Sequence, residues 1–281
     1  MGFLDLTRPE HAYLFGFVQC DGSLKAGPGQ KGAVTVELAA RDRHLLEEVQ
    51  RIVPFYTSIR TRTRRTNFSS EYTSVIWTLH AFAAREELTR LGLPTGRKSK
   101  ILKPPSVPFS QADYLRGLVD ADGSVGFMTH RSVPFISLTT SSEALKDFFI
   151  ASCPSVTGAP RGRRRNDRDR VFNLLVMREA TVELAQELYY EGCLAIPRKL
   201  DAARHVKGWV RSPDMPVAAA RRTWTPAEHD LILRTTIADA ARILGRTQQS
   251  VNLRRWRLRT ALRICARASA LGELKPSYDP L

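Results

Sequence analysis

A repeat with a period of 101 residues constrains this chain more than any other feature of its sequence. The segment YLFGFVQCDGS at residues 13–23 recurs as YLRGLVDADGS at residues 114–124, with seven of the eleven positions identical. The dipeptide Arg-Lys at 97–98 recurs at the same offset, at 198–199. Because separate features keep register across so many residues, we predict that residues 1–208 are two copies of one module.

Within each copy, stretches with the hydrophobic period of a helix and stretches with that of a strand follow one another in the same order. A helix over the repeated segment is followed by alternating stretches, such as 34–38 and 136–138, that are typical of half-buried strands. The pattern then predicts helices at 43–52 and 142–150, a basic hairpin, strands at 74–79 and 171–177, and closing helices at 83–91 and 179–190. The order αββαββα, read twice, predicts an α+β fold of two pseudosymmetric repeats.

Composition and breaks in the pattern predict the domain organisation. Hydrophobic residues make up 43% of the 281 residues, enough for a packed core. We expect the first repeat over 1–103, the second over 104–208, a linker over 209–220, a helical module over 221–262 and a C-terminal tail over 263–281.

The charge balance indicates a polyanionic partner. The chain has 43 Lys and Arg against 28 Asp and Glu, a formal net charge of +15, and nucleic acid is the commonest partner of so basic a protein. The four cysteines form no CxxC pair and the six histidines show no zinc-ligand spacing, so we expect reduced thiols and no zinc site. No secretion signal or membrane-spanning run is found, and we expect a cytoplasmic, nucleoid-associated monomer.

An acidic residue near the end of each repeated segment is a candidate metal ligand. If the two helices pack side by side, Gly16 and Gly117 let their backbones approach closely, and Asp21 and Asp122 then meet at the helix ends. Two carboxylates at the negative ends of two helix dipoles form an unfavourable cluster, which a hard divalent cation such as Mg²⁺ relieves. Such a cation can activate water for phosphodiester hydrolysis. The glycines that follow, at 22 and 123, are expected to end the helices in the left-handed conformation.

These paired segments resemble the LAGLIDADG signature of single-chain, two-motif homing endonucleases. The resemblance implies a site-specific double-strand DNA endonuclease that uses Mg²⁺, with Mn²⁺ as a substitute, at two pseudosymmetric sites. It implies that Asp21 and Asp122 are metal ligands and that the carbonyl groups of Cys20 and Ala121 contribute. The sixth motif position is an aspartate in the second copy but Gln19 in the first. In the family that position is not the essential ligand.

Lys98 and Lys199 each follow their own motif aspartate by 77 residues. They resemble the basic residue that members of the family place beside each active site to polarise water or offset phosphate charge. The alternative is a pair of solvated lysines at helix ends.

The basic hairpins are the second expected DNA-binding feature. Alternating arginines on a strand share one face, and a twisted ribbon with arginines on one face fits along the major groove. The alternative is a solvated edge hairpin. Together the copies would form a β-saddle over a long pseudopalindromic site of about two turns of double-stranded DNA. The expected contacts are Arg60, Arg62, Arg64 and Arg65 in the first copy and Arg161, Arg163, Arg164 and Arg165 in the second.

The region 221–262 resembles a helix-turn-helix of the Myb/SANT type. Thr225 and Glu228 form a capping box before the first helix, and further helices are expected at 237–244 and 248–258. Trp224 and Trp256 are expected to be core aromatics. The region holds nine arginines and three acidic residues, which favours DNA over a protein partner. The expected contacts are Gln248, Gln249, Asn252, Arg254 and Arg255.

A catalytically silent binding protein of the same fold is the alternative to the nuclease, either a DNA-binding regulator with a helix-turn-helix or an RNA-splicing maturase. Degenerate members of the family usually lose the motif acids. This chain keeps both Asp21 and Asp122, which favours the nuclease.

Overall fold

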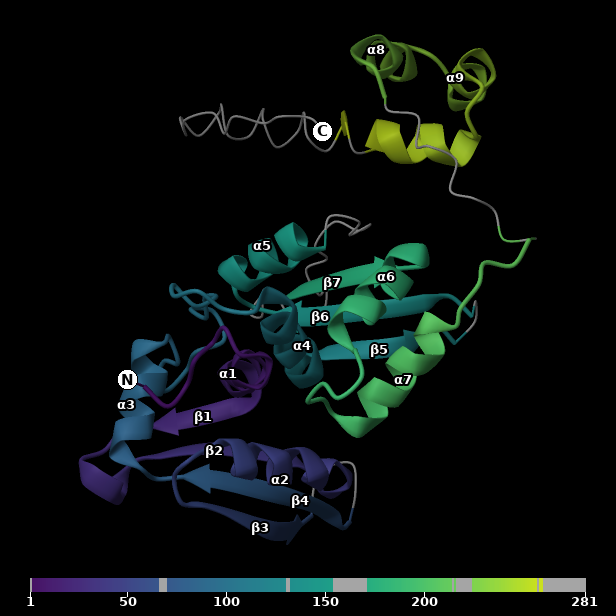
Figure 1. Cartoon of the computed structure of the whole chain (residues 1–281). Coiled ribbons are helices and arrows are strands. Elements are labelled where there is room, and N and C mark those ends of the chain that lie inside the picture. The colour runs from purple at the N-terminus through teal and green to yellow at the C-terminus, as the bar shows by residue number, and fades with distance from the viewer. Residues whose placement is uncertain are drawn as a thin grey trace, which may run out of the picture. The chain divides into compact units, whose positions relative to one another are not determined.

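The computed structural model describes residues 2–65, 70–129, 132–153, 171–213, 215, 224–256 and 258–259. The chain divides into two compact units, Met1–Ser212 and Pro213–Leu281, which are described separately. Both are drawn in Figure 1. No helix in the described parts of the chain is long and apolar enough to cross a membrane.

The first repeat has the predicted order of elements. Its helix at 43–52 is confirmed with the predicted bounds. Its four described strands form one antiparallel sheet in the order β1-β2-β4-β3. The elements are α1 (Pro9–Asp21), β1 (Gly22–Lys25), η1 (Gly29–Lys31), β2 (Ala33–Ala39), η2 (Ala40–Asp42), α2 (Arg43–Ile52), β3 (Thr57–Arg64), β4 (Tyr72–Leu79) and α3 (Phe82–Arg90).

The second repeat follows the same order where it is described. Its three described strands form an antiparallel sheet in the order β5-β6-β7. The predicted hairpin, with Arg161, Arg163, Arg164 and Arg165, lies outside the described residues. The helix that carries Lys199, α7, was not among the expected elements. The elements are α4 (Gln111–Asp122), β5 (Gly123–Phe127), β6 (Pro134–Thr140), α5 (Glu143–Ser152), β7 (Phe172–Met177), α6 (Glu179–Leu188) and α7 (Pro197–Lys207).

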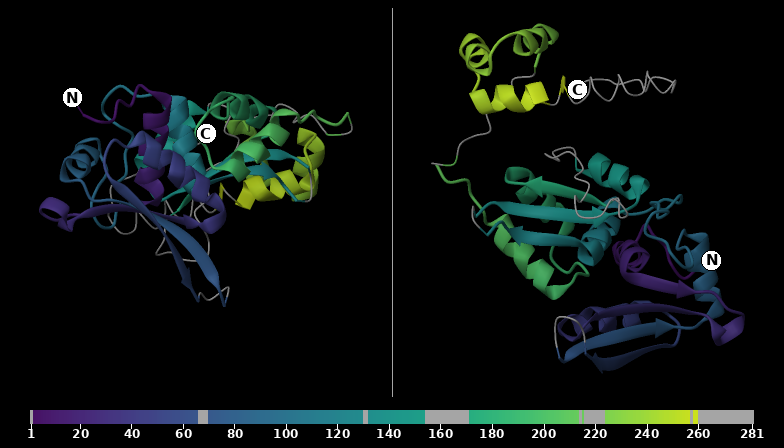
Figure 2. Two further views of the ribbon diagram at one scale, coloured as in Figure 1. Left: turned by 60° about the horizontal axis from the view of Figure 1, so that its bottom comes forward. Right: turned by 180° about the vertical axis from the view of Figure 1, so that it is seen from behind.

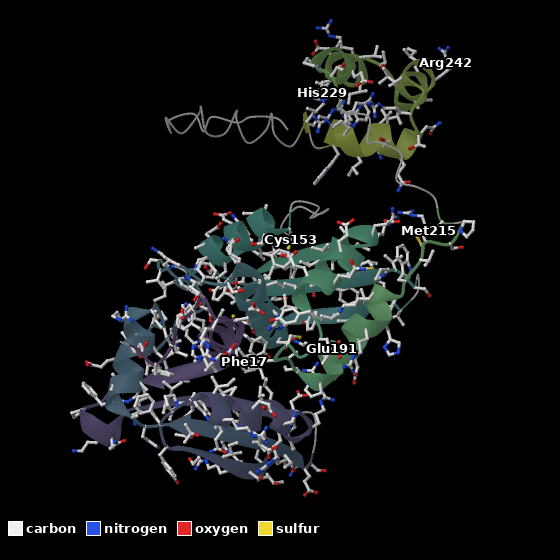
Figure 3. The ribbon with its side chains drawn as sticks, viewed as in Figure 1. Phe17, Cys153, Glu191, Met215, His229 and Arg242 are labelled. Atoms are coloured by element: carbon white, nitrogen blue, oxygen red, sulfur yellow. The ribbon has the colours of Figure 1, made fainter. Side chains whose placement is uncertain are left out.

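The two motif helices, α1 and α4, lie side by side near the centre of the first unit, with one sheet on each side of the pair (Figure 1). Figure 2 shows this arrangement from two further directions. Both helices are buried along nearly their whole length, and one hydrophobic core joins the two repeats. Phe17, on α1, lies in this interior and stacks on Tyr13 with 5.9 Å between ring centroids (Figure 3). The motif helices are therefore the interface between the repeats.

Glycine makes this close packing possible, as the sequence predicted. A Cβ atom added at Gly16 would lie 2.5 Å from the carbonyl oxygen of Tyr114. One added at Gly117 would lie 2.3 Å from the carbonyl oxygen of Tyr13. Each helix therefore rests against the other's backbone at the same position of the repeat.

The expected left-handed conformation after the motif helices is wrong. Gly22 has φ −75° and Gly123 has φ −113°, and both lead directly into a strand. Glycine is required at both positions because there is no room for a Cβ atom. A Cβ atom at Gly22 would lie 2.4 Å from the carbonyl oxygen of Val18, and one at Gly123 would lie 2.3 Å from that of Ser137. The chain passes from helix to strand without a turn, which keeps each motif aspartate at the start of a sheet.

The described residues of the second unit contain three helical segments: α8 (Pro226–Arg234), α9 (Ile237–Leu244) and residues 248–256. The predicted capping box is confirmed, because Thr225 and Glu228 bond each other's backbone N–H groups. A small core of its own holds the unit together, around Ile232 and Val251, and Trp224 packs against it. The expectation that Trp256 is a core residue is wrong, because it is 60% exposed. His229 of α8 and Arg242 of α9 mark this unit in Figure 3.

Candidate active site

The two motif acids stand at equivalent places, each the last residue of a motif helix. Asp21 ends α1 and Asp122 ends α4. Burial is the largest cause that raises the pKa of Asp21 to about 6, and the nearby charge of Asp122 is the second. Burial also raises the pKa of Asp122, although a hydrogen bond from the Cys20 thiol and the charges of two lysines act against it. The charge of Asp122 thus acts on Asp21 across the interface between the repeats.

The two lysines are buried beside these acids. Lys98 donates from Nζ to the carbonyl oxygens of Gln19 and Cys20, the second at 2.7 Å. Lys199 donates to three carbonyl oxygens at the end of α4: Val119 at 2.8 Å, Asp120 at 2.5 Å and Gly123 at 2.9 Å. Burial lowers the pKa of both lysines, while the neighbouring acids raise it. Each lysine thus caps the negative end of its own motif helix, so neither is a solvated surface residue.

The lysines are not equivalent, although the sequence placed them at the same spacing. An ammonium group has three N–H donors. Lys199 uses all three on backbone carbonyl groups, whereas Lys98 uses two. Within the described part of the chain, one donor of Lys98 therefore remains for a water molecule or a phosphate oxygen, and Lys199 offers none without breaking a backbone contact.

The sixth motif position joins the two repeats. Tyr13 donates from its hydroxyl to Asp120 at 2.8 Å, and Tyr114 donates to Gln19 at 2.5 Å. The tyrosines are themselves 101 residues apart, so one contact is made twice across the interface. Asp120 also accepts from the Tyr189 hydroxyl at 2.8 Å and from the Ile196 N–H at 2.7 Å. Sequence reasoning missed this network, although the tyrosine pair in the repeat was a signal for it.

An ion pair crosses between the repeats near the same site. Arg198, next to Lys199, lies 3.2 Å from the carboxylate of Asp42, which is buried at the start of α2. Because the partners belong to different repeats, the pair fixes α7 of the second copy against α2 of the first. Its counterpart in the first copy, Arg97, is exposed.

The residues present fit a divalent metal in one specific way. Among the described residues there is no group of three or more His, Cys, Asp and Glu side chains that could enclose a metal. Two carboxylates that repel each other suit Mg²⁺ instead, because Mg²⁺ binds one or two carboxylates and fills its other positions with water and phosphate oxygens. The carbonyl oxygen of Cys20, a predicted ligand, already accepts a hydrogen bond from Lys98, whereas no lysine among the described residues donates to the carbonyl oxygen of Ala121. The carboxylates are therefore the principal candidate ligands.

The raised pKa of Asp21 predicts a pH dependence of stability without metal. Between pH 4 and 6 the Asp21 carboxyl binds more protons in the folded protein than in the unfolded chain. The contribution of Asp21 to the free energy of unfolding therefore falls as the pH rises through that range. We expect the Asp21→Asn variant to gain stability over the unsubstituted protein as the pH rises from about 4 to 6, with no further gain above. Urea unfolding in EDTA at several pH values measures this. The exposed Asp201→Asn is the control, and a gain independent of pH would contradict the shifted pKa.

The outer face of the first sheet carries the predicted arginines. Side chains of Val34, Val36 and Leu38 point into the core, so the alternate residues of the paired strands point outward. Arg60, Arg62 and Arg64 share that outer face, as predicted, and Arg65 follows them in an exposed position. Glu37 lies on the same face, 3.3 Å from Arg64 and 4.0 Å from Arg62. It also accepts from the Ser74 hydroxyl at 2.6 Å.

In the second unit the structure divides the predicted DNA contacts into two groups. Gln248, Gln249 and Asn252 are exposed. The guanidinium group of Arg254 instead donates to His229 at 2.9 Å, and that of Arg255 to the carbonyl oxygens of Ile232 and Thr235. Both arginines therefore bind within their own unit.

Residues 8–89 and 110–150 of this chain match the family model described as a LAGLIDADG-like domain. The matched residues include both motif helices and both acids. No curated protein sequence matches the chain at a significant level.

Among solved structures, the chain is similar to the homing endonuclease I-WcaI bound to its DNA recognition sequence. The TM-score is 0.50 at 12% identity, over 70% of this chain and 87% of that one. The homing endonuclease I-GzeII in complex with its DNA target gives a TM-score of 0.45 at 12% identity, over 72% and 89% of the two chains. The N-terminal LAGLIDADG domain of DUF199/WhiA gives 0.34 at 14% identity, over 76% and 96%. The first likeness confirms the predicted α+β fold with two antiparallel sheets.

Proposed function

We propose that this protein is a Mg²⁺-dependent DNA endonuclease that hydrolyses one phosphodiester bond in each strand of a long target site. The observation that carries the proposal is the pair Asp21 and Asp122, brought together at the ends of two crossing helices with a buried lysine beside each. The +15 net charge and the arginines on the outer face of the first sheet support DNA as the substrate.

The residues of the site have distinct roles in this proposal. Asp21 and Asp122 would hold the divalent cations through their carboxylates. A bound cation would supply activation of water and stabilisation of the charge on the leaving oxygen. Lys98 keeps one N–H donor for a water molecule or a phosphate oxygen, and Lys199 orients the end of α4 through its backbone contacts. The tyrosines hold the two helices in register, so that both acids meet the substrate together.

The outer face of the first sheet is proposed to bind the DNA. Arg60, Arg62 and Arg64 alternate along β3, so their spacing follows one groove, and guanidinium groups there read guanine or contact phosphate. Glu37 holds Arg62 and Arg64 in place. Arginines positioned before binding lose less side-chain entropy on contact with the bases.

The second unit is proposed to be a helix-turn-helix that adds DNA contacts. Residues 248–256 would be the recognition helix, with Gln248, Gln249 and Asn252 toward the bases, because these side chains are exposed. Arg254 and Arg255 were predicted to contact DNA. Their contacts with α8 and the residues that follow it favour a role in holding the recognition helix in position.

Deletion of residues 213–281 tests this unit. The deletion removes twelve basic and six acidic residues but leaves the core of the first unit intact. We expect weaker DNA binding, a smaller dependence of affinity on salt, and residual cleavage. The slope of log K against log salt should fall by about 0.9 for each phosphate that the protein no longer neutralises. Affinity and slope equal to those of the full chain would assign the unit to protein contacts instead.

Selection of sites from a random DNA library tests the function as a whole. The purified full chain is incubated with the library and Mg²⁺, and bound and cleaved molecules are sequenced separately. Recovery of one cleaved site with cuts in both strands supports the endonuclease. A protein that binds one sequence but cuts no DNA with Mg²⁺ or Mn²⁺ is instead a catalytically silent DNA-binding protein. The three backbone contacts of the Lys199 ammonium group favour this alternative, because they leave it no donor for the substrate.

A further inference from the structure

The outer face of the second sheet differs in chemistry from that of the first. Side chains of Ile136, Leu138, Leu174 and Val176 are buried in the core, so their neighbours along β6 and β7 point to the opposite face. The outward residues of the three described strands carry no charge. They are Ser124, Gly126, Phe135, Ser137, Thr139, Asn173, Leu175 and Met177.

Three of these outward residues form an apolar strip. Phe135 and Met177 are directly opposite each other across β6 and β7, and Leu175 is opposite Ser137, the next outward pair along the strands. All three are partly exposed, and none of them packs against the hydrophobic core. Asn173 follows on the same face, opposite Thr139. Adjacent apolar side chains that reach a surface can take part in contact with a partner.

The equivalent face of the first sheet carries several charged side chains among neutral ones such as Thr35 and Ser74. Its outward residues include Lys25, Glu37 and the three arginines of β3. The two faces occupy equivalent positions of the repeat, so they are expected to meet the same kind of partner. If that partner is DNA, the described strands of the second sheet have no charge with which to bind phosphate. They must recognise the bases by shape and by neutral contacts.

Only one base pair presents an apolar group in the major groove, namely A·T through the thymine methyl. Phe135, Leu175 and Met177 match that group in chemistry. An asparagine side chain can pair with the N6 and N7 atoms of adenine, so Asn173 suits the other base of the same pair. Arginines on the first sheet suit guanine. The chemistry of the two faces therefore differs in the base pairs that each can read.

We propose that the second sheet reads A·T pairs through thymine methyl groups, so that the target site is asymmetric, with an A·T-rich half under β5–β7 and guanines under β3. This rests on the proposed function, because it takes the outer faces of the sheets as the DNA-binding surface. It replaces the pseudopalindromic site expected from the repeat with two halves of different composition.

Replacement of thymine by deoxyuridine tests the proposal, because it removes only the 5-methyl group. The full chain is titrated against its selected site, with deoxyuridine placed in one half or the other. The half under the first sheet is the one in which the Arg60→Ala variant loses its base preference. We expect roughly fourfold weaker binding for each recognised methyl group removed from the other half, and no change from substitution under β3.

Variants separate the apolar strip from a general effect on binding. Leu175→Ala and Met177→Ala, both at outward positions, should bind thymine and deoxyuridine sites with equal affinity. The matched control, Arg60→Ala, should weaken binding but keep the discrimination. Equal binding of both sites by the unsubstituted protein would overturn the methyl readout while leaving the nuclease proposal intact. Absence of binding to any DNA would overturn both, and the apolar strip would then be assigned to a protein partner.

Discussion

Asp21→Asn and Asp122→Asn variants are expected to lose DNA cleavage by on the order of a thousandfold or more while keeping nearly the same affinity for DNA. Asparagine has the size of aspartate but lacks the negative charge that holds a divalent cation. The acids lie at the ends of α1 and α4, whereas the arginines proposed to hold the DNA lie on β3, so the two functions separate. Single-turnover cleavage with saturating enzyme measures the first, and a binding titration in Ca²⁺ the second.

The exposed Asp201→Asn variant provides the control, because it removes an equal charge from the same unit. Each motif variant should also be more stable than the unsubstituted protein at neutral pH without metal, since burial raises the pKa of both acids. Cleavage at the unsubstituted rate by either variant would show that the metal is bound elsewhere. Loss of DNA binding together with cleavage would place the acids in the DNA contact.

Gly117→Ala is expected to destabilise the protein by about 2–4 kcal/mol. Alanine favours a helix over glycine by about 1 kcal/mol, so intrinsic propensity alone predicts a gain. The added Cβ atom, however, would lie 2.3 Å from the carbonyl oxygen of Tyr13 and 2.8 Å from the backbone nitrogen of Phe17. Backbone atoms of a packed helix yield only if the whole helix moves. Separation of α1 and α4 would also lengthen both tyrosine hydrogen bonds.

Urea unfolding of the first unit measures this destabilisation. Gly208→Ala is the matched control, because Gly208 ends α7 in a helical conformation and its added Cβ atom meets nothing closer than 3.7 Å. That variant should stay within about 0.5 kcal/mol of the unsubstituted protein. If Gly117→Ala is equally harmless, the helices do not cross at the described distance.

The repeat made most of the fold predictable. Register between the copies identified the motif helices, and the close approach of Gly16 and Gly117 followed from the need for small residues where helices cross. Alternation of polar and apolar residues placed the strands, and it placed the arginines of β3 on one face. These features depend on local sequence or on the symmetry of the copies, so a single sequence contains the information.

What the sequence did not predict depends on contacts between distant segments. Arg116 replaces Phe15 of the first copy and is fully buried, with its guanidinium 2.6 Å from Asp113 and bonded to the carbonyl oxygens of Leu188 and Leu194. A buried charge on an apolar helix becomes explicable only once these partners are known. The difference between Lys98 and Lys199 likewise arises from the segments that carry them, because Lys199 lies on α7 and Lys98 lies outside any helix or strand. Spacing alone made them equal.

The paired tyrosine contacts have a consequence for how such a protein can diversify. A contact that recurs around a two-fold axis is the kind that two identical subunits make with each other. In an assembly of identical subunits, one substitution changes both halves at once. Here the acceptor is an amide in one half and a carboxylate in the other, at Gln19 and Asp120, and both are satisfied. Joining the halves in one polypeptide lets each be altered alone, so new specificities can be built one half-site at a time.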